Sequence, residues 1–207
     1  SQELFTGART LFGSWRGGMG LAAVTSCGIF SAISGSSMAT AASMSRVALP
    51  EMEKNGYAPT LATGTLAAGG TLGIMIPPSI ALLLYALITE QSVGDMFIAG
   101  VIPGLLGLVL YGVTVAVLVI VYPNIAQPGE ATTLKQKLVG LKGLVPFTGV
   151  FLFIIGGIYS GWFTPTEAAA VGAAATWLIA TVRGINFEKF LEAIQETLVM
   201  SAIIFFM

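Results

Sequence analysis

The sequence predicts an all-α polytopic membrane protein, and three observations lead to this fold class. Hydrophobic residues make up 55% of the 207 residues and charged residues only 9%, whereas a soluble domain has about 25% charged residues. Apolar runs long enough to cross a bilayer recur along the chain. The 26 glycines are typical of closely packed or interrupted membrane helices. Because so few charges cannot solvate a globule of this size, we expect the chain to lie in a lipid bilayer.

The residue types that the chain lacks argue against several classes of function. There is no histidine, and a single cysteine, Cys27, excludes an internal disulfide framework. Histidine is the commonest metal ligand and general base, so we expect no enzyme and no organic cofactor. The formal net charge of −1 gives no signal for nucleic-acid binding. The chain starts at Ser1 without a signal peptide and ends in an apolar run, and we interpret both ends as cuts through a larger protein.

Apolar and polar stretches alternate along the chain and define the expected elements. One crossing of about 30 Å of hydrocarbon takes about 20 residues, so the length of each apolar stretch indicates how it lies in the membrane. In order, we expect an interfacial amphipathic segment at 1–16, a hairpin at 17–49, a broken helix at 57–89, a spanning helix at 97–122, a cytoplasmic linker at 123–142, and spans at 143–161 and 166–182 before an incomplete last helix.

The stretch 17–49 does not fit a simple spanning helix. It is too long for one upright helix and too short for two full crossings at a rise of about 1.5 Å per residue. The polar residues from Ser34 to Ser37 fall near its midpoint. These lengths predict a re-entrant hairpin, in which two half-length helices meet at an irregular tip inside the membrane. Such a tip is tolerated only where protein or water surrounds it.

The positions of the basic residues give an independent argument for the hairpin. Positive charges gather on the cytoplasmic side of membrane proteins. A re-entrant hairpin places every basic cluster on that side and leaves acidic Glu90 and Asp95 outside, whereas a full crossing would divide the first basic residues between both faces. The basic residues that enter this argument are Arg9, Arg16, Arg46, Lys54, Lys135, Lys137, Lys142, Arg183 and Lys189.

The tip of the hairpin is the first candidate binding site. It consists of Ser34, Gly35, Ser36 and Ser37, with Thr40 beside them. Helix ends inside the membrane expose unpaired backbone groups, and serine hydroxyls add oxygen ligands, so this cluster suits a dehydrated cation or a carboxylate. The alternative is a polar helix–helix contact or a kink in an ordinary span.

The broken helix carries the second candidate site. A continuous helix over 57–89 would be about 50 Å long, well beyond the bilayer core. Glycines at 69, 70 and 73 and a proline pair interrupt it, and prolines remove amide donors and disfavour helix before them. The alternative is a proline kink that binds nothing. The candidate segment runs from Gly69 to Ser79.

A third motif, Thr164-Pro165-Thr166-Glu167, precedes the apolar stretch 166–182. It has the pattern of a capping box, with Thr164 at the N-cap, proline at the first helical position and Glu167 reaching back to an amide. The alternative is that Glu167 is a proton-relay carboxylate. Because the residue lies at the end of a span, we interpret Thr164 and Glu167 as a structural cap.

Six motifs follow one another with a recognisable order and spacing. They are FSAISGSSMAT at 30–40, LPEM at 49–52, NGY at 55–57, GIMIPPS at 73–79, FIAGVIPG at 97–104 and GWFTPTEAAA at 161–170. In this order they resemble the large membrane subunit of tripartite ATP-independent periplasmic (TRAP) transporters, a part of the ion-transporter superfamily. The resemblance covers nearly the whole chain.

The resemblance implies a fold and a function that the composition alone does not. The family is an elevator-type secondary transporter of two inverted repeats, each with one re-entrant hairpin and one broken helix. Its transport is driven by sodium, a periplasmic binding protein delivers the organic-acid substrate, and a small membrane subunit of four helices supports the large one. The resemblance therefore implies a multi-pass protein of the bacterial inner membrane, with sodium as coupling ion and a dicarboxylate or sugar acid as substrate.

The same resemblance assigns parts of the chain to the domains of such a transporter. Residues 17–96 correspond to half of the transport domain, 97–122 to a scaffold helix, and 143–207 to the start of the second repeat, truncated before its hairpin. The resemblance implies that the tip and the unwound crossing clasp one sodium ion and form half of the substrate site. The tip residues are Ser34, Gly35, Ser36 and Ser37, and those of the unwound crossing are Thr71, Gly73, Pro77, Pro78 and Ser79. The other half lies outside this chain, which also lacks the opening helices of the family.

Two other functions remain compatible with the helices. A binding-protein-independent sodium/carboxylate symporter of the same superfamily would share the hairpin and the broken helix, and only the motifs named above argue against it. A non-transporting membrane scaffold subunit would explain the helices but not two adjacent interruptions. An enzyme fits least, because few acidic residues and no histidine are left for chemistry inside the membrane.

Overall fold

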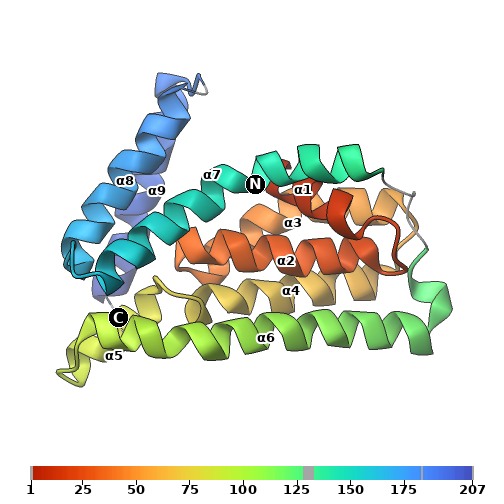
Figure 1. Cartoon of the computed structure of the whole chain (residues 1–207), viewed down its shortest axis with the longest axis horizontal. Coiled ribbons are helices and arrows are strands. Elements are labelled where there is room, and N and C mark those ends of the chain that lie inside the picture. Colours follow the sequence, from red (N-terminus) through yellow and green to blue (C-terminus); the bar gives the residue numbers. More distant parts are fainter. Residues whose placement is uncertain (1, 128–132, 183, 207) are drawn as a thin grey trace. The chain divides into compact units, whose positions relative to one another are not determined.

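The computed structural model describes residues 2–127, 133–182 and 184–206. Within these ranges the prediction of an all-α chain is confirmed (Figure 1). The elements are α1 Gln2–Phe12, α2 Gly18–Ser34, α3 Ser37–Lys54, α4 Pro59–Met75, α5 Ile80–Ile88, α6 Val93–Val121, the 3-10 turn η1 Pro123–Ile125, α7 Leu134–Tyr159, α8 Pro165–Val182 and α9 Phe187–Phe206. The chain forms two compact units, Ser1–Ala168 and Ala169–Met207.

The first unit is built around α2, α3 and α4, which all pack against one another. Figure 1 shows α2 and α4 running side by side with the long α6 beneath them, and α1 and α7 on the opposite side. The core includes Phe5 of α1, Met44 and Met52 of α3, and Leu66 of α4, all at most 2% exposed. The N-terminal helix is therefore buried against the hairpin on one side, and whether its other side meets the membrane surface stays a prediction.

Three helical segments are long and apolar enough to cross a membrane, judged by length and composition over the described residues. They are Pro59–Ile88, which combines α4 and α5, then Val93–Val121 and Lys135–Tyr159. The stretch 166–182, expected to be a further span, forms α8 but is not among the three. The structure thus supports a membrane protein with three candidate spans.

The linker expected at 123–142 is helical over much of its length. After η1, α7 begins at Leu134 and continues without interruption into the expected span at 143–161. Thr133 and Gln136 form a capping box at its start, and the following Lys, Gln and Leu residues are strong helix formers. The polar composition of this stretch therefore does not indicate a loop. Residues 128–132 of this linker lie outside the described residues.

The hairpin has a tip at the predicted position but longer limbs than predicted. Gly35 and Ser36 separate α2, of 17 residues, from α3, of 18 residues. At a rise of 1.5 Å per residue each limb is about 25–27 Å long, more than half of a bilayer core of about 30 Å. The expected end of the hairpin at Leu49 is wrong, because α3 continues through Pro50 to Lys54. Whether the hairpin is re-entrant stays a prediction.

The broken helix is interrupted at one place, and the glycines before it have another role. α4 stays helical up to Met75, and α5 begins at Ile80 after Ser79, with a cis peptide bond between Pro77 and Pro78. The unwinding expected from Gly69 onward is thus confined to Ile76–Ser79. The helical glycines of α4 instead allow close packing, because a Cβ atom on Gly73 would lie 2.5 Å from the carbonyl oxygen of Ser36.

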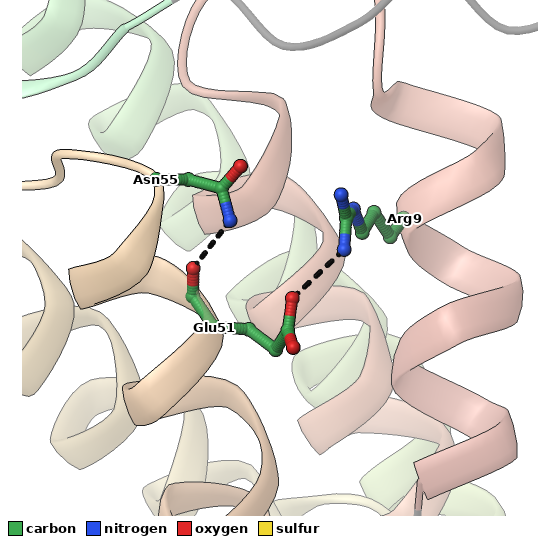
Figure 2. A network of polar contacts seen from close by, with 3 residues as sticks. All are labelled: Arg9, Glu51 and Asn55. Carbon is green, nitrogen blue, oxygen red and sulfur yellow. Dashed lines mark hydrogen bonds and ion pairs between the residues drawn. The ribbon is translucent and has the colours of Figure 1, made fainter.

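The base of the hairpin is tied to α1 by a polar network, shown in Figure 2. Arg9 Nη1 donates to Glu51 Oε2 over 2.9 Å, and Asn55 Nδ2 donates to the Glu51 carbonyl oxygen over 2.7 Å. Glu51 lies in the last turn of α3, where the helix dipole disfavours a carboxylate. The guanidinium of Arg9 offsets this cost, and Asn55 caps the end of the helix.

The second unit contains most of α8 together with α9. A ring contact in this unit joins Trp177 of α8 to Phe190 of α9, with centroids 6.3 Å apart. Residue Arg183, which the charge argument placed on the cytoplasmic side, lies outside the described residues. The expected sidedness of Lys189 in α9 stays a prediction.

We expect the Arg9–Glu51 ion pair to contribute modestly to stability. Both side chains are partly exposed, at 37% and 41%, so solvent screens the pair and its coupling free energy should be about 0.2–1 kcal/mol. A double-mutant cycle with Arg9→Gln, Glu51→Gln and the double variant, measured by chemical unfolding of the full-length protein in detergent, tests this value. Strictly additive losses would show that the pair contributes nothing.

We expect Gly73→Ala to destabilise the protein. The added methyl group would meet the carbonyl oxygen, carbonyl carbon and amide nitrogen of the tip at 2.5–2.8 Å, and backbone atoms cannot move aside cheaply, so the loss should be about 1–3 kcal/mol. The matched control is Gly149→Ala in α7, where no atom lies within 4 Å of the added group. That variant should be neutral or gain up to about 1 kcal/mol from helix propensity. Equal melting temperatures for the two variants in detergent would contradict the close contact.

Candidate functional site

The hairpin tip and the break in α4–α5 lie directly against each other. A Cβ atom on Gly69 would lie 2.9 Å from Cys27 Sγ, and one on Gly35 would lie 2.8 Å from the carbonyl oxygen of Pro78. Because both positions advance together along the chain, α2 and α4 run parallel, and Figure 1 shows them side by side. The amide of Ile80 donates to the carbonyl oxygen of Gly35 over 3.2 Å. The two predicted sites therefore form one.

Two helices begin at this site, and each begins with a serine. Ser36 caps α3, where its Oγ accepts from the amide of Ala39 over 3.3 Å. Ser79 caps α5, where its Oγ accepts from the amide of Leu82 over 3.4 Å and donates to the carbonyl oxygen of Ile74 over 2.9 Å. Helix N-termini carry partial positive charge and free amides, so this part of the site favours an anion.

Two other helices end at the same place. α2 ends at Ser34, and the amide of Gly35 donates back to the carbonyl oxygen of Ser31 over 3.0 Å with a left-handed φ of 60°. α4 ends at Met75, and the amide of Ile76 donates to Leu72 over 2.9 Å. The last carbonyls of a helix lack intrahelical donors and carry partial negative charge. This part of the site therefore favours a cation.

The hydroxyls of the tip differ in whether they already make hydrogen bonds within the chain. Ser34 Oγ and Thr40 Oγ1 lie 2.7 Å apart and share a hydrogen bond, and Thr40 is fully buried. Ser37 is half-buried, and no hydrogen bond to its hydroxyl is found among the described residues. Of the predicted tip residues, Ser37 therefore has the hydroxyl that is most available to a ligand.

Thr71 is not brought to the tip. Because α4 remains helical there, Thr71 points about 200° away from Gly73, two residues further on. Its Oγ1 donates to the carbonyl oxygen of Ala68 over 2.6 Å and shares a hydrogen bond with the hydroxyl of Tyr111 in α6 over 2.9 Å. The structure thus separates Thr71 from Gly73, Pro78 and Ser79, which do meet the tip, whereas Pro77 lies against Gly100 of α6.

Ser31 is a residue that the sequence pattern did not single out. Its side chain is fully buried, and its hydroxyl has no hydrogen-bond partner among the described residues. It lies one helical turn beyond Cys27, which faces Gly69, so the parallel register places it at the level of Gly73. An unsatisfied buried hydroxyl is costly, and its place beside the tip marks it as a candidate ligand.

Ser26 is also buried with an unpartnered hydroxyl, but it lies elsewhere on α2 than Ser31. It is fully buried in α2, and its hydroxyl also lacks a partner within the described part of the chain. It lies about two turns from the tip, on a different side of the helix from Ser31. Ser26 and Ser31 thus differ in their distance from the tip and in the side of α2 on which they lie.

The Thr164–Glu167 motif makes the reciprocal bonds of a capping box. The amide of Thr164 donates to Glu167 Oε2 over 2.8 Å, and the amide of Glu167 donates to Thr164 Oγ1 over 3.3 Å. The Thr164 hydroxyl also donates to the same carboxylate oxygen over 2.9 Å. These contacts occupy the carboxylate at the start of α8, as the interpretation of a structural cap requires.

Comparison with known proteins connects this arrangement to one family. Residues 1–207 match the family described as "Tripartite ATP-independent periplasmic transporter, DctM component". A C4-dicarboxylate TRAP transporter large permease protein of Pseudomonas aeruginosa is 42% identical over 181 residues, which are 87% of this chain and 42% of that protein.

Relatives with other named substrates match over more of the chain. A sialic acid TRAP transporter large permease protein of Vibrio cholerae is 31% identical and covers 99% of this chain. An ectoine TRAP transporter large permease protein of Halomonas elongata is also 31% identical over 99% of this chain. The chain spans 48% of each of these two relatives, or about half of their length. With a family match over all its residues, the chain belongs to the DctM component family of tripartite ATP-independent periplasmic transporters.

Proposed function

We propose that this chain is part of the permease that takes up an organic acid across the bacterial inner membrane, driven by sodium and supplied by a periplasmic binding protein. The observation that carries the proposal is the meeting of four helix ends at the tip and the break. Carbonyl groups of α2 and α4 would hold sodium, and the N-termini of α3 and α5 would hold the carboxylate of the substrate. A cation and an anion bound together offset part of each other's burial cost.

The position along α6 at which the break packs supports a re-entrant hairpin. Cβ atoms on Gly100 and Gly104 of α6 would lie 3.3 Å and 3.2 Å from the carbonyl oxygen of Met75. These glycines are 7 and 11 positions after Val93, so the break lies about 10–17 Å from one end of a helix about 44 Å long. The tip packs against that break and would therefore lie inside the membrane.

The distribution of charge supports the expected orientation. Figure 1 shows the α1–α2 and α3–α4 connections at one end of α6 and the α5–α6 turn at its other end. Exposed Arg16 and Lys54 lie in or next to the first two connections, and exposed Glu90 and Asp95 lie in or next to the third. By the positive-inside rule the base of the hairpin would face the cytoplasm.

The remaining assignments follow from membership of the family. We propose that residues 17–96 form half of an elevator-type transport domain, that 97–122 belong to the scaffold, and that 143–207 begin a second, inverted repeat. A small four-helix membrane subunit and a periplasmic binding protein would be the partners. The substrates named for the relatives range from C4-dicarboxylates to sialic acid and ectoine, and all three carry a carboxylate, which the N-termini of α3 and α5 would suit.

We expect Ser37→Ala and Ser31→Ala to raise the sodium concentration for half-maximal uptake. Each removes one oxygen ligand, and a lost charge-assisted contact is worth about 1.5–3 kcal/mol, or about ten- to a hundredfold in affinity. Ser36→Ala should do the same, with about 1 kcal/mol of additional destabilisation because it also removes the cap of α3. Uptake is measured in proteoliposomes with the full-length subunit, its small subunit and the binding protein.

The matched control is Ser26→Ala. It removes an equally buried and equally unpartnered hydroxyl from the same helix, away from the tip. Sodium dependence should be unchanged in this variant, and protein abundance should be equal in all of them. If the Ser31, Ser36 and Ser37 variants behave like the Ser26 control, these hydroxyls are packing groups and the proposed site is misplaced.

We expect both ends of the hairpin to face the cytoplasm. Single cysteines replacing Arg16 and Lys54, which are both exposed, should react with a membrane-permeant maleimide and not with an impermeant one in intact cells. The experiment uses the full-length protein with Cys27 replaced by alanine, and Glu90→Cys is the control that the impermeant reagent should reach once the outer membrane is permeabilised. Labelling of position 16 or 54 by the impermeant reagent would contradict a re-entrant hairpin.

A further inference from the structure

The exposed face of α3, which carries Arg46, does not suit lipid. All residues of α3 are described, and Met38 is the only large hydrophobic side chain among them that is exposed. The exposed face of α6, by contrast, consists of large aliphatic side chains such as Ile102 and Val109. The other exposed residues of α3 are Ala42, Arg46, Pro50, Glu53 and Lys54. This face therefore suits water or polar groups and not lipid tails.

Because α3 continues to Lys54, Arg46 lies inside the second limb of the hairpin and not at its base. It is eight residues before Lys54 and ten residues after Ser36, or about 12 Å and 15 Å along the helix axis. In a limb that enters the membrane, a charged side chain is costly when it faces lipid. Such residues face a water-filled cavity or an ion pair, and they mark the pathways of substrates and ions.

The guanidinium of Arg46 has no acidic partner within the described part of the chain. The nearest acidic residues on α3 are Glu51 and Glu53, five and seven positions later. Side chains on a helix pair when they are three or four positions apart, so neither is in the right place. Glu51 is moreover bound by Arg9 over 2.9 Å. An exposed cation without a partner on this face is available to an anion from outside the described residues.

The backbone at Arg46 also calls for a polar environment. Pro50 lies inside α3 and has no amide hydrogen, so it cannot donate the bond that normally satisfies the carbonyl oxygen of Arg46. Pro50 is exposed and lies one turn further along the same face of the helix. The observation on the carbonyl group is independent of the one on the side chain. Together they indicate that water reaches α3 at the level of Arg46.

The same face of α3 leads from Arg46 to the proposed ligand site. Ala42 and Ala39 lie four and seven positions before Arg46 and therefore share its face. Ala42 is exposed and Ala39 is half-buried, and neither has a side chain large enough to obstruct a ligand. Between the cap at Ser36 and Lys54, Arg46 is the only basic residue. A carboxylate that leaves the N-terminus of α3 along this face therefore meets Arg46 first, about 15 Å away.

We propose that Arg46 is a second, transient carboxylate site, in a water-filled passage that α3 lines between the ligand site and the cytoplasm. The inference rests on the proposed function, which brings an organic acid to the tip and places the base of the hairpin in the cytoplasm. A guanidinium donates two parallel hydrogen bonds to a carboxylate. Because Arg46 is exposed, water screens the pair and keeps it weak, so the acid is held briefly and then released.

Charged thiol reagents test the passage. Inside-out membrane vesicles contain the full-length subunit with Cys27→Ala and Ala42→Cys, together with the small subunit. An anionic (sulfonate) and a cationic (ammonium) methanethiosulfonate are added, and both should react at position 42. Adding Arg46→Gln should lower the ratio of anionic to cationic reaction rates about tenfold at low ionic strength. One charge about 6 Å away, the spacing of residues four apart on a helix, changes each rate about threefold in water, in opposite directions.

Three further variants control this measurement. Lys54→Gln removes an equal charge at the base of α3 and should leave the ratio at position 42 unchanged. Leu106→Cys, on the aliphatic face of α6, should react with neither reagent. Arg46→Met is a second neutral variant that keeps the apolar stem of the side chain, and it should behave as Arg46→Gln does. If position 42 is unreactive, or if neither neutral variant changes the ratio, the proposal is overturned.

Succinate, added to the same vesicles without sodium, tests for carboxylate binding. It should slow the reaction of position 42 with the cationic reagent, while succinamide, its uncharged analogue, should not. Arg46→Gln should raise the half-protecting succinate concentration about two- to fivefold, as expected for an exposed ion pair, and Arg46→Lys should restore much of the protection. Equal protection with and without the arginine would contradict a carboxylate site. A lower melting temperature of Arg46→Gln with an unchanged rate ratio would assign Arg46 to a structural ion pair instead.

These labelling measurements need neither sodium nor uptake. If they give the expected results while the serine variants leave sodium dependence unchanged, the Arg46 site stands and the proposed ligand site fails. If the serine variants shift sodium dependence but position 42 does not react, the ligand site stands and the Arg46 site fails.

Discussion

The rest of the structure depends on the direct contact between two interrupted helices. Inside a membrane no water is available to satisfy a broken backbone, so an interruption is tolerated only against protein or a polar cavity. Here each interruption faces the other, and the amide of Ile80 donates to the carbonyl oxygen of Gly35. Gly73 lets the tip approach to this distance, and Gly35 lets it turn with a positive φ. Neither element would be stable in this form without the other.

This contact also brings helix ends of opposite polarity together. Because α2 and α4 end where α3 and α5 begin, negative and positive helix ends lie together without a single charged side chain among the tip and break residues. Charge complementarity then comes from backbone dipoles, which are fixed by the fold. The hydroxyls of Ser36 and Ser79 accept capping bonds, so they hold the helix ends in place.

Much of the fold could be predicted from the sequence, because the length of an apolar stretch and the position of a proline act on the local backbone. The tip at Gly35-Ser36 and an interruption at the proline pair could be predicted from them. The length of α3, the helical start of α7 and the role of Gly73 could not, since each depends on what packs alongside. The resemblance assigns Thr71 to the unwound crossing, but the helical phase of α4 turns it toward Tyr111. Ser31 was missed because its importance depends on the register between two helices.

Contacts at the base of the hairpin help to hold the tip against the break. There the amide of Met19 donates to the hydroxyl of Tyr57 over 3.1 Å, and the amide of Ala58 donates to the carbonyl oxygen of Ile125 over 2.9 Å. The hairpin is thus held at its base by polar contacts, along its length by a buried core and at its tip by backbone contacts. Separating tip from break would expose this core and unpair these groups together, at a cost well above that of one contact.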